Sequence, residues 1–227
     1  MAQVKEDNID ISEKIGNAER YVTDNKKSLT IIASAVVGVI AVYLGYQQFI
    51  VKPQEENARK EMYVAEQYFS KDSLNLAING DGSFPGFKEI TENYGSSQSG
   101  NLAQYYLGMS YLKKGEYDKA IETLKAYDAE DDVTGALALG GIAGAQLELG
   151  HLDEALDYYK KAADWDENNF TKPIFMMKSA MVYEMKKDYK SSLDIYKQVK
   201  AEFPNSSDAR DIDKYIGRAE ALSGSEK

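Results

Sequence analysis

The sequence predicts an all-α protein in which a single N-terminal transmembrane helix precedes an α-solenoid of antiparallel helix pairs. Two observations predict this fold class. The run from Leu29 to Val51 has no charged side chain, although charged residues make up 28% of the chain. Residues 101–206 repeat a pattern of small and aromatic residues with a period near 35 residues. Repeats of that length are typical of stacked supersecondary units.

Composition excludes several functional classes. The 227 residues have a formal net charge of −10, no cysteine and one histidine. Without cysteine there is no disulfide scaffold, thiolate zinc site or cysteine nucleophile. The single histidine, His151, follows a predicted turn glycine, and no phosphate-loop, serine-hydrolase or zinc-protease motif is present. We therefore expect no catalytic residue, no metal, no cofactor and no small-molecule substrate, and the acidic balance argues against nucleic acid.

Residues 29–51 have the properties of a membrane span. Twenty-three helical residues cover about 34 Å, and a hydrocarbon core is about 30 Å thick. Lys26 and Lys27 flank one end of the run, and Lys52 flanks the other. A buried core helix is rarely this long without a charge, and an acidic leader is a poor start for a cleaved signal peptide. Among these three interpretations, the sequence favours an uncleaved anchor.

The lysines before the span favour a cytoplasmic N-terminal segment, residues 1–28, with the remaining chain on the other side of the membrane. Small residues share one face of the span. They are Ser34, Gly38, Ala41 and Gly45. Because small faces let two helices approach closely in lipid, we predict a contact face for a partner's membrane helix or for a second copy. Ordinary use of glycine and alanine in a span is the alternative.

Three aligned segments carry the repeat. Each places small residues where two antiparallel helices would cross. These residues are Gly108, Ala143 and Ala180 in the first helices, and Ala120, Ala155 and Ser192 in the second helices. The second set recurs at spacings of 35 and 37 residues. Gly115 and Gly150 stand where a left-handed residue would end the first helix, and Lys187 departs from that pattern.

These segments resemble the tetratricopeptide repeat (TPR), a helix-turn-helix unit of about 34 residues. In the first segment, Leu107, Gly108 and Tyr111 match the Leu-Gly-x-x-Tyr motif of the repeat. The resemblance extends to the flanking sequence and implies a domain organisation. We expect a linker helix and degenerate first repeat at residues 52–100, three repeats with a C-terminal capping helix at 101–222, and a tail at 223–227.

The TPR resemblance also implies a peptide groove, because the first helix of each repeat lines the concave face of such a solenoid. Counting from the aligned positions gives an apolar lining that is rich in methionine. The predicted groove residues are Tyr105, Met109, Leu112, Leu147, Met177 and Met181. Methionine adapts to varied partners, which favours recognition of apolar segments. Burial of each side chain by the neighbouring repeat is an equally weighted alternative.

The whole arrangement resembles the YfgM-like family, ancillary subunits of the bacterial SecYEG translocon. The run ERYVTDNKKSL before the span, and the passage of the span into a charged helix, carry this resemblance. It implies a single-pass inner-membrane protein with a cytoplasmic N-terminus and a periplasmic TPR domain. The implied partners are Sec translocon subunits, periplasmic chaperones or unfolded clients, and membrane lipid. A structural scaffold or homo-oligomer of another cell-envelope complex is the alternative.

Overall fold

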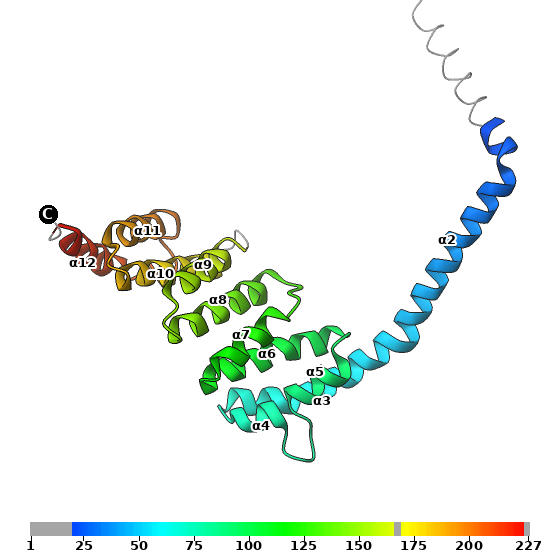
Figure 1. The fold of residues 1–227 in the computed structure, drawn as a ribbon, viewed down its shortest axis with the longest axis horizontal. Coiled ribbons are helices and arrows are strands. Elements are labelled where there is room, and N and C mark those ends of the chain that lie inside the picture. The colour runs from blue at the N-terminus through cyan, green and yellow to red at the C-terminus, as the bar shows by residue number, and fades with distance from the viewer. Residues whose placement is uncertain (1–19, 166–168, 225–227) are drawn as a thin grey trace, which may run out of the picture. The chain divides into compact units, whose positions relative to one another are not determined.

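The computed structural model describes residues 20–165 and 169–224, and the regular structure within these ranges is entirely helical (Figure 1). The predicted all-α class is therefore confirmed. The chain forms two compact units, Met1–Pro53 and Gln54–Lys227. Each unit is described on its own below.

The first unit contains helix α2 (Lys26–Tyr46), none of whose residues is buried, and the π-helical turn η1 (Gln47–Val51). These elements belong to Lys26–Ser70, which in the described part of the chain is the one helix long and apolar enough to cross a membrane. Signal sequences also meet this criterion of length and composition. Of the predicted cytoplasmic segment 1–28, residues 1–19 lie outside the described residues.

Pro53 accounts for the π-helical turn. Proline has no N–H group, and its ring collides with the carbonyl group four residues earlier, which here belongs to Phe49. Just before the proline, the Lys52 N–H group bonds to the Gln47 carbonyl oxygen, one residue further back than in an α-helix. The wider turn accommodates Pro53, so the helix continues past it, as the sequence predicts.

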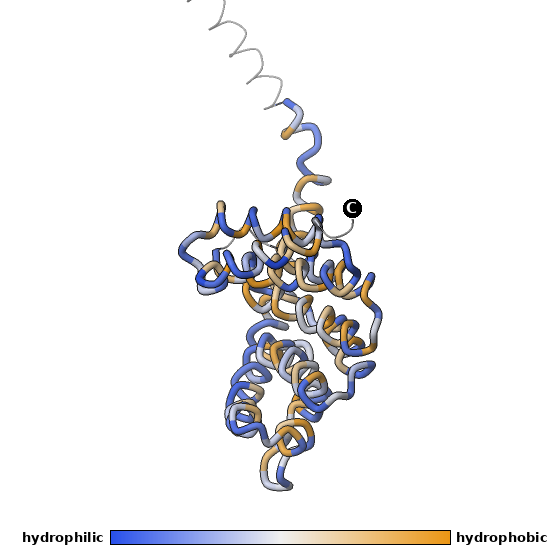
Figure 2. Tube along the Cα trace, turned by 90° about the vertical axis from the view of Figure 1, so that its left-hand side faces the viewer, coloured by the Kyte–Doolittle hydropathy of each residue, from blue (hydrophilic) through white to orange (hydrophobic). Residues whose placement is uncertain are grey.

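The second unit is a stack of helices. Its helices are α3 (Lys52–Ser70, which begins at the unit boundary), α4 (Leu74–Asn79), α5 (Phe87–Tyr94), α6 (Gln98–Lys114), α7 (Tyr117–Lys125), α8 (Asp132–Glu148), α9 (Leu152–Ala163), α10 (Thr171–Met185), α11 (Tyr189–Glu202) and α12 (Ile212–Gly224). From α5 to α12, each helix packs against the next one in the chain. Figure 2 shows hydrophilic and hydrophobic residues interleaved along these helices, as expected when one face is buried.

The same turn joins the two helices of three successive pairs, α6–α7, α8–α9 and α10–α11. The residue that ends each first helix has a positive φ, which is 81° at Gly115, 81° at Gly150 and 63° at Lys187. The next N–H group bonds to the carbonyl oxygen five residues back, at 2.9 Å in all three turns. This is a Schellman cap, so the three pairs reverse direction in the same way.

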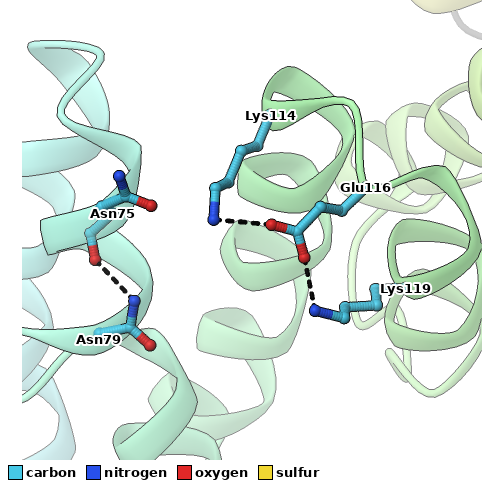
Figure 3. Close-up of polar contacts among 5 residues, drawn as sticks. All are labelled: Asn75, Asn79, Lys114, Glu116 and Lys119. Atoms are coloured by element: carbon cyan, nitrogen blue, oxygen red, sulfur yellow. Dashed lines mark hydrogen bonds and ion pairs between the residues drawn. The ribbon is translucent and has the colours of Figure 1, made fainter.

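Ion pairs add to the first of these turns. In Figure 3 the Glu116 carboxylate lies between two ammonium groups, 2.7 Å from Lys114 Nζ and 2.6 Å from Lys119 Nζ. The bonds from Lys114 and then Lys119 lower the pKa of Glu116. Figure 3 also shows the Asn79 side-chain amide donating to the Asn75 carbonyl oxygen, at 3.1 Å within α4. Because the ion pairs are accessible to water, we expect them to contribute little to stability.

Small residues lie at the helix crossings, as the sequence predicts. Ala120, Ala155 and Ser192 on the second helices are each 0% exposed. On α6, a Cβ atom placed at Gly108 would lie 2.6 Å from Leu124 Cγ of α7. Larger side chains at these positions would push the paired helices apart.

The region before α6 contains a short helix, α4, that the sequence analysis does not predict. It follows a sharp turn in which Asp72 has a φ of 58°. In the next loop, Asp81 accepts hydrogen bonds from its own loop backbone and, at 2.6 Å, from the Tyr68 hydroxyl group of α3. Helices α3, α4, α5 and α6 then share one apolar cluster. Its larger buried members are Met62, Ile78, Phe87, Ile90 and Leu107.

Candidate functional site

The predicted groove residues on α6 lie at its contact with α8. Tyr105, Met109 and Leu112 are all half-buried. A Cβ atom placed at Gly141 of α8 would lie 3.0 Å from Met109 Sδ and 3.7 Å from Leu112 Cδ2. These two side chains therefore pack onto α8 with part of their surface and leave the remainder accessible.

Tyr105 belongs to an aromatic group between α6 and the end of α7. The centre of its ring is 5.5 Å from that of Tyr106 and 5.7 Å from that of Tyr127. Burial raises the pKa of Tyr105 to about 12. The phenol therefore stays protonated at neutral pH and keeps its O–H group as a hydrogen-bond donor.

On α8, Leu147 is half-buried against the largest apolar cluster. The glycines of this helix differ in their surroundings. A Cβ atom at Gly140 would lie 2.1 Å from Phe175 Cε1 of α10, whereas one at Gly144 would meet only the Tyr159 hydroxyl oxygen, at 3.7 Å. Gly140 thus permits the close approach of α10, and Gly144 leaves space beside α8.

The predicted residues on α10 line a pocket. Met177 is 5% exposed and Met181 is 38% exposed, and the two lie one helical turn apart. The pocket beside them has a volume of about 270 Å³. Its lining consists of Ile174, Met177, Lys178 and Met181 from α10, Ser207, Asp208 and Asp211 from the α11–α12 connection, and Tyr215 from α12. We call it the α10–α12 pocket. It brings together Met177 and Met181 but none of the predicted residues of α6 or α8.

The pocket forms because α12 does not pack closely against α10. Helix α8 packs against both α6 and α10, whereas α12 does not pack closely against α10. At one end the two helices are linked by Arg218, whose Nε and Nη2 atoms lie 3.3 and 2.5 Å from the Glu184 carboxylate oxygens. Towards the α11–α12 connection, residues 203–211, the gap stays open.

Asp208, Asp211 and Tyr215 were not among the predicted groove residues. The C-terminal end of residues 101–222 was predicted as a capping helix only. The available signal was the cluster of acidic residues just before α12, but helical periodicity does not indicate the path of a connection. Only the folded chain places these side chains opposite Met177 and Met181.

The predicted contact face of the membrane helix lies on α2. Ser34, Gly38 and Ala41 are exposed, and Gly45 is half-buried. A Cβ atom at Gly38 or Gly45 would have no neighbour within 4 Å. Within the first unit, this face of α2 is therefore uncovered.

Few groups in the described residues are arranged for chemistry. His151 lies in an exposed turn, with Nδ1 2.8 Å from Gln146 Oε1. Within residues 20–165 and 169–224, no three His, Cys, Asp or Glu side chains form a group that could hold a metal ion. The features that stand out are accessible apolar and acidic surfaces, which suit binding.

Comparisons with known proteins place the helix pairs in a family. Family models described as tetratricopeptide repeat match residues 102–130, 136–169 and 175–206. Each match coincides with one helix pair and its Schellman turn. These three segments are tetratricopeptide repeats. The TPR resemblance is thus confirmed for α6 to α11, and the degenerate TPR at residues 52–100 stays a prediction.

The curated relatives share the TPR region. Tetratricopeptide repeat protein 29 of Macaca fascicularis is 29% identical over 118 residues, and that of Homo sapiens is 30% identical over 104 residues. These matches cover 48% and 42% of this chain but 25% and 22% of the relatives. The chain therefore matches about a quarter of the length of these relatives, and the similarity concerns the repeats.

Solved structures agree on the fold. One is the crystal structure of the nearly identical TPR-like repeats of a putative kinesin light chain from Podosopora anserina. It superposes with a TM-score of 0.59 at 13% identity, covering 75% of this chain and 89% of that one. The crystal structure of a single-residue variant of those repeats has the same TM-score. Because TPR solenoids present extended binding surfaces, the repeats imply a role in protein–protein interaction.

Proposed function

We propose that this chain is a membrane-anchored TPR interaction protein that serves as an accessory subunit of the bacterial Sec export translocon. Its TPR domain lies on the periplasmic side of the inner membrane. There it binds translocon subunits, periplasmic chaperones or unfolded clients. The proposed role involves binding and no catalytic step.

One observation carries this proposal: an apolar helix with no buried residue in α2 belongs to the same chain as three TPR repeats and continues as far as Ser70. Side chains of α2 such as Val39 and Val42 are 70% and 75% exposed. Each Å² of apolar surface left in water costs about 25 cal/mol, so a helix with this composition favours a lipid environment. The chain then holds its binding domain next to a membrane, where exported polypeptides emerge.

The small-residue face of α2 supports a partner within the membrane. Gly38 has open space where a side chain would project, and small residues allow the backbones of two helices to approach closely in lipid. A translocon membrane helix that packs here would keep the TPR domain beside the export channel.

Site-specific photocrosslinking in native membranes tests the proposal. We expect a benzoylphenylalanine at Gly38 to form adducts with membrane subunits of the translocon. The matched control places the same crosslinker at Ile40, which points to the opposite side of α2 and is also exposed. Adducts at Gly38 with lipid or with a second copy only would contradict the translocon assignment.

A further inference from the structure

The α10–α12 pocket combines an apolar interior with an acidic rim. Of the lining residues, Met177 is buried, while Met181 and Tyr215 remain partly accessible. Asp208 and Asp211 line the pocket from the α11–α12 connection. An apolar surface beside carboxylates suits a ligand that carries both an apolar and a cationic group.

Within the part of the chain that the structure describes, the two rim carboxylates have no ion-pair partner. Among the described residues, neither Asp208 nor Asp211 is in an ion pair, and Asp208 only accepts a hydrogen bond from the Ser207 hydroxyl group, at 3.2 Å. The one basic residue in the lining is Lys178, whose Nζ atom is 5.8 Å from the ring centre of Tyr159 on α9. The lining therefore keeps a net negative charge.

Two neighbouring cations are held by other carboxylates, and Arg210 and Lys214 do not line the pocket. Lys200 Nζ lies 2.5 Å from an Asp213 carboxylate oxygen, and Arg218 bonds to Glu184. Neither basic group lines the pocket. A cation from a ligand would thus meet two available carboxylates without first breaking these ion pairs.

We propose that the α10–α12 pocket binds an extended polypeptide segment in which a lysine or arginine is followed by apolar side chains. This inference rests on the proposed function and names the class of polypeptide that the TPR domain selects. One apolar side chain of the segment packs against Met177 and Met181. The preceding cation lies at the rim, beside Asp208 and Asp211.

The accessibility of the pocket favours a side chain of a polymer over a free small molecule. Small-molecule sites usually enclose most of their ligand, and this pocket of about 270 Å³ is lined on one side by exposed residues such as Met181. An extended segment can place one side chain in such a pocket while its backbone continues along the surface.

The test measures binding of fluorescently labelled peptides to the full chain in lipid nanodiscs by fluorescence anisotropy. One peptide carries lysines followed by leucines, and a second carries glutamates in place of the lysines. We expect the lysine peptide to bind about tenfold more tightly at low salt, with the difference shrinking as salt is added. Equal affinity for the two peptides would overturn the inference.

Two double variants test whether the preference for the lysine peptide arises from the carboxylates of the pocket. We expect Asp208→Asn together with Asp211→Asn to weaken binding of the lysine peptide about tenfold. The same variant should not weaken binding of the glutamate peptide. The control pair, Asp118→Asn with Glu122→Gln on α7, removes the same charge from exposed positions that do not line the pocket. An equal loss in the control pair would assign the effect to overall charge and overturn the inference.

A third variant tests the apolar part. Met181→Gln changes an exposed side chain, so we expect the melting temperature to stay the same while both peptides bind more weakly. Unchanged binding of both peptides would overturn the apolar contact.

Binding of an unfolded export client to the full chain distinguishes this inference from the proposed function. Client binding without selection for lysine overturns the pocket alone, and loss of all polypeptide binding overturns both proposals.

Discussion

Lys187 occupies the turn position that glycine occupies in the first two repeats. Its φ of 63° lies in the left-handed region, where a Cβ atom costs about 1 kcal/mol. We predict that Lys187→Gly raises the free energy of unfolding by about 1 kcal/mol, since glycine adopts this conformation without that cost. Urea denaturation of the full chain in detergent would measure the change. The matched variant Gly150→Lys should lower stability by a similar amount, and no change in either variant would contradict this explanation.

Asp131 caps the N-terminus of α8. Its Oδ1 atom accepts hydrogen bonds from the N–H groups of Val133 and Thr134, at 2.9 and 2.8 Å, and Oδ2 accepts one from the Thr134 hydroxyl group. The Thr134 side-chain bond, followed by the backbone bonds, lowers the pKa of Asp131. A lowered pKa in the folded state means that this stabilisation is present above the ordinary carboxyl pKa and is lost as the pH falls through the folded-state value.

We therefore predict that Asp131→Ala costs about 1 kcal/mol of stability at neutral pH. The difference from the unchanged protein should shrink as the pH falls below the ordinary carboxyl pKa of about 4 and then through the lower pKa of folded Asp131. Denaturation curves at neutral and acidic pH would measure both quantities. Glu122→Ala, at an exposed position on α7, should change stability by less than about 0.5 kcal/mol. A cost for Asp131→Ala that does not vary with pH would contradict the capping role of the charge.

Two glycines of α8, Gly140 and Gly144, differ in the space available for a side chain. At Gly140 an added Cβ atom would meet the buried Phe175 ring, so we predict that Gly140→Ala costs about 1–3 kcal/mol. At Gly144 there is space, and Gly144→Ala should stabilise the chain by up to about 1 kcal/mol through its higher helix propensity. Thermal melts of the two variants provide a matched comparison. Equal effects of the two substitutions would contradict the packing of α10 against α8.

Local signals were sufficient to predict the helix pairs. Turn glycines such as Gly115 end helices through their own backbone conformation, and small residues such as Ala120 indicate where helices cross. Both signals are contained within one repeat. The order of helices from α6 to α12 and the repeat family therefore followed from the sequence.

Features that depend on packing between repeats were not predicted. Helix α4 lies within residues 52–100, where the predicted repeat is degenerate, and the π-helical turn arises from a collision of Pro53 with the preceding turn. The α10–α12 pocket depends on how far α12 lies from α10, which no spacing within the sequence specifies. Met177 and Met181 were therefore predicted as lining residues, while Asp208 and Asp211 were not. Of the predicted tail at 223–227, residues 225–227 lie outside the described part of the chain.

As a whole, the molecule combines an apolar helix with an acidic TPR domain. In a solenoid each repeat contacts mainly its neighbours, so the surface near α12 can vary without affecting the packing near α3. The net charge of −10 makes the chain better suited to cationic than to acidic partners. These properties agree with a tethered protein that binds segments of other polypeptides.

Affinity purification of the full chain from native membranes tests this account most directly. We predict that mild detergent extracts yield translocon membrane subunits together with export chaperones or clients, identified by mass spectrometry. A variant in which residues 29–51 are replaced by an unrelated span should lose the membrane subunits and keep the partners of the TPR domain. Recovery of a self-assembled oligomer of this chain, with no export component, would contradict the account.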